Sequence, residues 1–285
     1  MSSPKFRAVA TSLVLVGAAG LTAVSATAPA HAATPPIQVS ISKNRVVTMP
    51  DLIQQGVNKF RITTSARGGS GFQLAMPADG YTEDEANRDF ELGLDQGKIK
   101  PLKRFEANVT LYGGVGVTER KATLVVDLDP GTYWALDTHT RKAAKFFTFT
   151  VGDLDTGNAV PASPTIKAKG STKWGKSPAS IPNKGSLTFK NRTDQNHFIV
   201  LVKLKKGKDL QDFEEWFLVE GPPQGPPPVN FDLGLDSGVT GPGLSMTFDY
   251  NLPKGNYVLL CFWPDADMGG MPHAFMGMYR GIKLK

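Results

Sequence analysis

The residues best suited to chemistry lie near the C-terminus of this 285-residue chain. Cys261, the only cysteine, is followed by His273 and Met278 in a loop rich in proline, glycine and methionine. A thiolate and two imidazoles with a weak axial thioether form a blue-copper site, because soft sulfur holds Cu(I) and imidazole suits both oxidation states. The second imidazole must come from elsewhere, and His139 and His197 are the candidates. The competing interpretation is that the lone thiol packs as a small hydrophobe.

Several short motifs occur in a fixed order along the second half of the sequence. They are Asn196-His197-Phe198, then Gly255–Cys261, then Pro272-His273 and Gly277-Met278. This order resembles that of the cupredoxin family, and more narrowly the cupredoxin-like proteins of the secreted actinobacterial type. The resemblance covers the C-terminal domain. It implies a β-sandwich that holds copper.

The resemblance also implies a role for each candidate ligand. His197 and His273 would be the equatorial imidazoles, Cys261 the thiolate and Met278 the axial thioether, with Met276 as its substitute. The alternatives stay open here: a lone histidine often hydrogen-bonds within a turn, and methionine often fills gaps under a loop. Eleven residues separate Cys261 from His273, whereas electron-transfer cupredoxins keep only a few. We therefore expect a less pre-organised loop.

Strands must position these residues, and the sequence predicts them on both sides of the loop. Tyr257 to Leu260 is a short apolar run rich in β-formers, and residues 281–285 alternate like a final strand. His197 lies just ahead of another apolar run. We therefore expect the thiol at the end of one strand and an imidazole at the start of another.

An offset of 124 residues aligns the two halves of the sequence, which indicates an internal repeat. It superposes Gly114 on Gly238, Leu128 on Leu252, Tyr133 on Tyr257 and Asp137 on Cys261. Upstream the correspondence is looser, and Phe60 parallels Leu187 at an offset of 127. Each copy also contains an acidic stretch that predicts a short helix, residues 82–90 and 208–217. The first copy lacks the cysteine, so we expect it to be metal-free and either structural or partner-binding.

These patterns predict an all-β protein with two tandem cupredoxin-like Greek-key β-sandwich domains. Residues 33–153 would form the degenerate first domain. Residues 154–164 are polar and rich in Pro, Gly and Ser, as linkers are. Residues 165–285 would form the second domain, which carries the predicted metal site.

Residues 1–32 are typical of a secretory signal peptide. Lys5 and Arg7 precede an apolar core, and Ala30-His31-Ala32 fits the small-x-small cleavage rule. No later run approaches the roughly 18 apolar residues of a spanning helix. We therefore expect a secreted protein that does not span a membrane. Removal of the signal lowers the net charge from +6 to +4, and this modest charge argues against a nucleic-acid partner.

Enzyme classes are not favoured by the sequence. Multicopper oxidases and nitrite reductases duplicate the same fold but need more histidines than the three that remain after the signal. No HExxH, GxSxG or P-loop motif occurs. We therefore expect a copper protein that serves electron transfer with a redox partner or extracytoplasmic copper handling. The competing hypothesis is a metal-free module of the same fold that binds a cell-envelope component or has a structural role.

Overall fold

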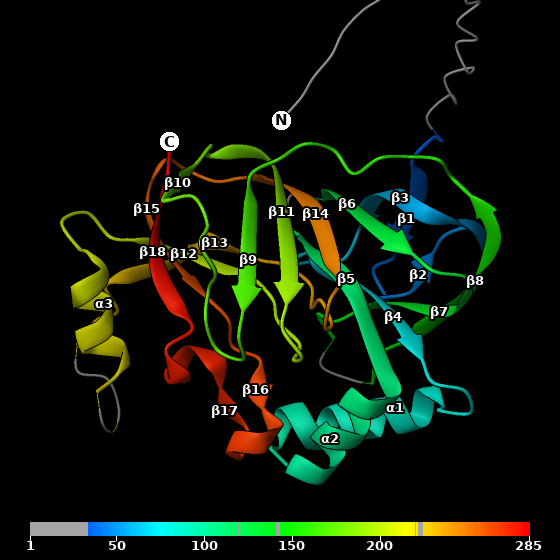
Figure 1. The fold of residues 1–285 in the computed structure, drawn as a ribbon, viewed down its shortest axis with the longest axis horizontal. Coiled ribbons are helices and arrows are strands. Elements are labelled where there is room, and N and C mark those ends of the chain that lie inside the picture. The colour runs from blue at the N-terminus through cyan, green and yellow to red at the C-terminus, as the bar shows by residue number, and fades with distance from the viewer. Residues whose placement is uncertain (1–33, 119, 141–142, 220, 222–224) are drawn as a thin grey trace, which may run out of the picture. The chain divides into compact units, whose positions relative to one another are not determined.

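The computed structural model describes residues 34–285 except residues 119, 141–142, 220 and 222–224. The predicted signal peptide lies outside the described residues. Strands dominate the described chain, as Figure 1 shows. Below, the first half means β1 to β8 with the helices between them, and the second half means β9 to β18 with theirs.

The first half folds into two layers that share one long strand, β3. Its strands are β1 (Ile37–Ile41), β2 (Val47–Thr48), β3 (Leu52–Thr64), β4 (Ser70–Pro77), β5 (Val109–Val117), β6 (Lys121–Leu128), β7 (Gly131–Asp137) and β8 (Phe146–Asp155). The end of β3 pairs in parallel with β1 and antiparallel with β6, whereas its start pairs in parallel with β8. From β8 the second layer continues through β7 and β4 to β5. Phe60 and Ile62 are buried between the layers while Arg61 faces solvent, as strand alternation requires.

The second half repeats this pairing pattern, apart from β2 in the first half and the β16–β17 hairpin in the second. Its strands are β9 (Thr165–Lys169), β10 (Ser180–Ile181), β11 (Lys184–Arg192), β12 (Val200–Leu204), β13 (Val229–Asp236), β14 (Ser245–Asn251), β15 (Gly255–Leu260), β16 (Pro264–Asp265), β17 (Met271–Pro272) and β18 (Tyr279–Leu284). One layer is β9-β11-β14 and the other is β10-β18-β15-β12-β13, with β10 and β11 together in the place of β3. Phe60 lies opposite Leu124 and Leu187 lies opposite Phe248, so Phe60 and Leu187 occupy equivalent places in the two pairing patterns.

The two halves meet at residues that the repeat makes equivalent. Leu124 on β6 lies opposite its own counterpart, Phe248 on β14, in an antiparallel pairing that joins the two halves. The amide of Gly238 donates to the carbonyl of Gly114 over 2.8 Å, and a Cβ on Gly238 would lie 2.2 Å from the Gly114 Cα. Only glycine fits such an approach. The fold is therefore two tandem cupredoxin-like β-sandwiches. Because equivalent residues of the two halves face each other, an approximate two-fold axis relates the halves. The exact domain limits stay a prediction.

Helices occupy equivalent connections in the two halves. Between β4 and β5 lie α1 (Glu83–Phe90), the π-helical turn η1 (Glu91–Asp95) and α2 (Ile99–Asn108), and between β12 and β13 lies α3 (Leu210–Phe217). The two predicted helices are confirmed as α1 and α3, and each begins with a capping box, at Thr82 and Asp209. Neither η1 nor α2 was predicted. In Figure 1, α2 lies beside the small β16–β17 hairpin. None of the described helices has the length and apolar character to cross a membrane.

Candidate metal centre

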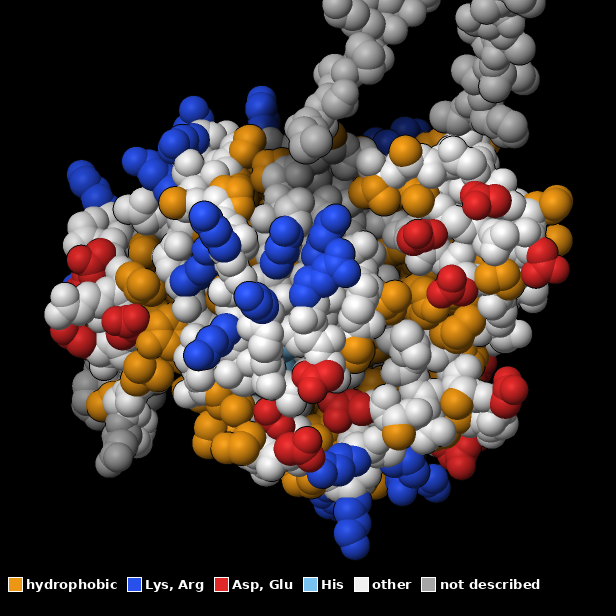
Figure 2. All heavy atoms as spheres, viewed as in Figure 1, with side chains coloured by type: hydrophobic (Ala, Val, Ile, Leu, Met, Phe, Trp, Pro, Cys, Tyr) orange, Lys and Arg blue, Asp and Glu red, His pale blue; other side chains and the backbone are white. Residues whose placement is uncertain are grey.

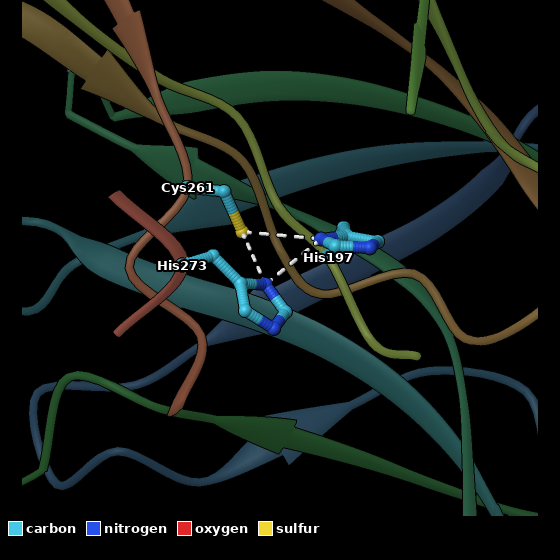
Figure 3. Close-up of side chains that lie close together, drawn as sticks. All are labelled: His197, Cys261 and His273. Carbon is cyan, nitrogen blue, oxygen red and sulfur yellow. Dashed lines mark hydrogen bonds between the residues drawn. The ribbon is translucent and has the colours of Figure 1, made fainter. Parts of the chain in front are cut away.

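Three predicted ligands converge in the interior of the second half, as Figure 3 shows. The Cys261 Sγ lies 3.5 Å from the His197 Nδ1 and 3.7 Å from the His273 Nδ1, and the two Nδ1 atoms lie 3.1 Å apart. All three residues are 0 % exposed. A point equidistant from the three atoms lies about 2.0 Å from each, close to metal–nitrogen and metal–sulfur bonds of about 2.0–2.3 Å. The residues fit a small metal ion.

Strand alternation places Cys261 in this core. Along β15, Tyr257 and Leu259 face the main core, whereas Val258 and Leu260 face a second cluster under α3. Cys261 directly follows β15 and points to the same side as Tyr257 and Leu259, so its thiol enters the space between the layers. Its amide donates to the Met278 carbonyl over 3.3 Å, which holds the strand end in place.

His197 is fixed by a turn ahead of β12. Its amide donates to the Thr240 carbonyl over 3.1 Å, and the Thr240 amide donates back over 2.8 Å. The buried Asn191 side chain also donates to the carbonyls of Gln195 and Thr240. This backbone clamp orients the imidazole before the strand begins.

The long loop between Cys261 and His273 is ordered by its own hairpin. Strands β16 and β17 pair, with Pro264 opposite Pro272. At the tip the Asp265 carboxylate accepts the amides of Asp267 and Met268 over 2.8 and 3.0 Å. Local pairing therefore orders this loop. The expected lower pre-organisation relative to a shorter loop stays a prediction.

The base of this hairpin carries His273. The His273 amide donates to the Trp263 carbonyl over 2.9 Å, so the imidazole and the segment after the thiol are tied together. The Asp265 carboxylate also accepts from Gln195 Nε2 over 3.0 Å, which links the hairpin to the turn that carries His197. All three ligand segments are thus bonded to one another.

Met278 lies next to both C-terminal ligands through its backbone. Its amide donates to the His273 carbonyl over 2.9 Å, and its carbonyl accepts from Cys261 and from the Trp174 indole. Its side chain is fully buried. The role of its thioether as axial ligand stays a prediction. His139 lies elsewhere, exposed in the connection between β7 and β8.

Burial keeps the three donor groups neutral in the metal-free protein. It raises the pKa of the Cys261 thiol to about 12. Burial lowers the pKa of His197 to about 3, and the nearby His273 adds to this effect. Burial also lowers the pKa of His273 to about 4, although the Asp265 carboxylate opposes this. Burial would raise the pKa of Asp265, but hydrogen bonds from Gln195 and the loop amides outweigh it and lower the pKa. Neutral imidazoles are ready to bind a metal, whereas the thiol must release its proton.

The first half holds a different group at the position of the cysteine. Asp137 is buried and accepts the Gly71 amide over 2.8 Å and the Arg45 guanidinium over 2.9 Å. The carboxylate is thereby paired within its own sandwich. Among the described residues, the one cluster of three close histidine, cysteine or acidic groups is that of the second half.

The first half nevertheless contacts the metal loop through α2, a contribution that the sequence analysis missed. The Trp263 indole donates to the Glu106 carboxylate over 2.7 Å, and Asn196 also hydrogen-bonds Glu106. Nearer solvent, Lys103 pairs with Asp267 over 2.6 Å. Glu106 and Trp263 are 157 positions apart, so no local pattern could have joined them.

No family model matches the chain, and neither does any curated protein. Among similar solved structures, reduced auracyanin from Roseiflexus castenholzii is 26% identical over 44% of this chain and 99% of its own, with a TM-score of 0.27. The copper-containing nitrite reductase of Thermus scotoductus is 12% identical over 88% of this chain and 61% of its own, with a TM-score of 0.24. A multicopper oxidase from Pediococcus acidilactici is 8% identical over 88% of this chain and 58% of its own, with a TM-score of 0.21. These TM-scores are too low to carry a functional conclusion.

Proposed function

We propose that this chain is an exported copper protein whose second half carries a type-1-like centre for electron transfer or extracytoplasmic copper handling. The observation that supports it most is the buried triangle of one sulfur and two Nδ1 atoms. A trigonal Cys–His₂ set of this kind is typical of blue-copper sites. Zinc would accept the same donors, so the metal must be tested directly.

In this proposal Cys261 supplies the thiolate, and His197 and His273 supply neutral imidazoles. Met278 would be the axial thioether, with Met276 as its substitute. Bound copper would supply a one-electron couple. The hydrogen bonds of the ligand segments hold these residues nearly fixed, so the protein would rearrange little between oxidation states. The buried position excludes water from the donor atoms.

We assign the first half a structural role. The repeated strand pairing supports an origin by duplication, with residues 33–153 and 165–285 as the two domains and residues 154–164 as the linker. Asp137 paired with Arg45 replaces the cysteine, so this half lacks the donor set. We propose that the chain is a carrier with a redox partner and not an enzyme. The residues after the predicted signal contain three histidines, fewer than multicopper oxidases and nitrite reductases need. That signal is the basis for proposing export.

Metal analysis of the purified protein tests the proposal. Protein expressed with copper in the medium should contain about one copper per chain. Cys261→Ser should lose most of it, and His139→Gln, which removes an exposed histidine outside the cluster, should retain it. Equal copper in all three proteins, or zinc in place of copper, would contradict the assignment.

A second candidate function is favoured by the charge on one face. Lys and Arg side chains gather over β9 and β11 in the centre of the face shown in Figure 2. Lys190 lies opposite Lys167 and Arg192 lies opposite Lys169 in that pairing, and like charges facing each other are unfavourable. Such a face suits an anionic cell-envelope component. Salt-sensitive sedimentation with phosphatidylglycerol vesicles, reduced in Lys167→Gln, would support this function, and sedimentation equal for both proteins would count against it.

A further inference from the structure

A cavity of about 990 Å³ lies between the two halves and is lined by residues of both. The first half contributes β4, β5, β7 and the segment from α1 to α2, and the second half contributes residues 236–239 and the edge of the metal loop. Small-molecule sites typically enclose about 300–1,000 Å³ and often lie between domains. The cavity therefore has the size and place of a ligand site, separate from the buried metal cluster.

Aromatic rings from both halves form part of the wall. Trp134 and Phe146 lie with ring centroids 4.8 Å apart, and Phe90 and Phe105 lie 5.8 Å apart. Trp263, at the edge of the metal loop, also lines the cavity. These rings offer apolar faces that also attract cations.

Some of the polar groups in the wall are already used by the protein. The Gln73 side chain accepts the Val239 amide over 2.8 Å and donates to the Val239 and Gly113 carbonyls, so it joins the two halves. The Asn87 side chain both donates to and accepts from the Ala144 backbone. These side chains are therefore already partnered within the protein.

Asp236, at the end of β13, is different. Its side chain is exposed to the cavity, and in the described parts of the chain no hydrogen bond or ion pair reaches its carboxylate. The surrounding protein raises its pKa by burial, although the nearby His139 opposes this. An exposed carboxylate without a partner in the protein is free to pair with a cation that enters the cavity.

We propose that this cavity binds a small hydrophobic organic cation, an amine on an aromatic or aliphatic body, with its ammonium group against Asp236. The rings accommodate the apolar body, and the carboxylate supplies the opposite charge. A neutral alcohol of the same shape fills the same space but brings no charge to pair. The proposal is independent of copper, because the metal ligands do not line the cavity.

Calorimetric titration of the purified metal-free protein at pH 7 tests it, with 2-(1-naphthyl)ethylamine and 2-(1-naphthyl)ethanol as probes. We expect one amine per chain, bound at least about tenfold tighter than the alcohol. Asp236→Asn should remove that preference. Asp232→Asn, on the same strand, exposed and outside the cavity, should keep it.

Three results would overturn the proposal: no binding of the amine at millimolar concentration, equal binding of amine and alcohol to the wild type, or an unchanged preference in Asp236→Asn. The first two comparisons use the wild type alone, so they hold even if the variant folds poorly. None of these outcomes bears on the copper centre.

Discussion

Replacement of Glu106 by alanine should destabilise the protein and disturb the metal loop. Glu106 on α2 accepts the indole N–H of Trp263 over 2.7 Å, and Trp263 is only 4 % exposed. Glu106→Ala leaves that buried donor without a partner, which costs about 1–3 kcal/mol. We expect the free energy of unfolding to fall by about 2 kcal/mol, a drop of about 4–8 °C in the melting temperature.

Glutamine at position 106 is the matched control. Burial raises the pKa of Glu106, opposed by the hydrogen bonds from Trp263 and Asn196, so the charged form is less favourable there than in water. Glu106→Gln keeps an oxygen to accept from Trp263 and removes the buried charge. Its stability should stay within about 1 kcal/mol of the wild type. Lys103→Ala removes an exposed ion pair with Asp267 and should cost no more than about 1 kcal/mol.

Urea unfolding of the metal-free proteins measures these differences. The copper-loaded proteins give a second measurement, because the Trp263 carbonyl accepts from the His273 amide. The thiolate-to-copper band should shift or weaken in Glu106→Ala and stay in place in Glu106→Gln and Lys103→Ala. The reasoning is refuted if the alanine and glutamine variants behave alike in both measurements.

Two further predictions concern charge in the two halves. Metal-free protein should lose about 4.5 kcal/mol between pH 6.5 and 4.5, because unfolded imidazoles take up protons that the folded His197 and His273 resist down to pH values of about 3 and 4. The urea midpoint measured as a function of pH tests this prediction. If the stability of His273→Gln falls as steeply with pH as that of the wild type, the prediction is contradicted. In the first half, Arg45→Ala should cost about 3 kcal/mol, because it leaves the buried Asp137 carboxylate without its cation. The double variant with Asp137→Asn should recover part of that loss in urea unfolding, and additive losses would count against the pairing.

Local patterns carried much of the prediction in the second half. The apolar run at Tyr257 is β15, and the alternation near the C-terminus is β18. The order of His197, Cys261 and His273 led to side chains that do converge. The two strands were predictable because strand alternation is visible among neighbouring residues. The ligand set came instead from the resemblance in motif order.

The failures concern contacts between distant segments. The spacing of Cys261 and His273 could not show that a hairpin between β16 and β17 orders the loop between them. The 124-residue offset revealed the repeat, yet it could not show that Gly114 and Gly238 touch each other. Nor could it show that Glu106 in the first half reaches the metal loop. Tertiary packing decides such contacts, and one sequence carries no periodic signal for them.

The most direct test of the central claim is an optical titration of the purified protein with Cu(II). We expect an intense visible thiolate-to-copper band that saturates at about one copper per chain. The band should be absent in Cys261→Ser and in His197→Ala, and retained in His139→Gln. No band in the wild type, or an equal band in Cys261→Ser, would contradict a copper–thiolate centre in this protein.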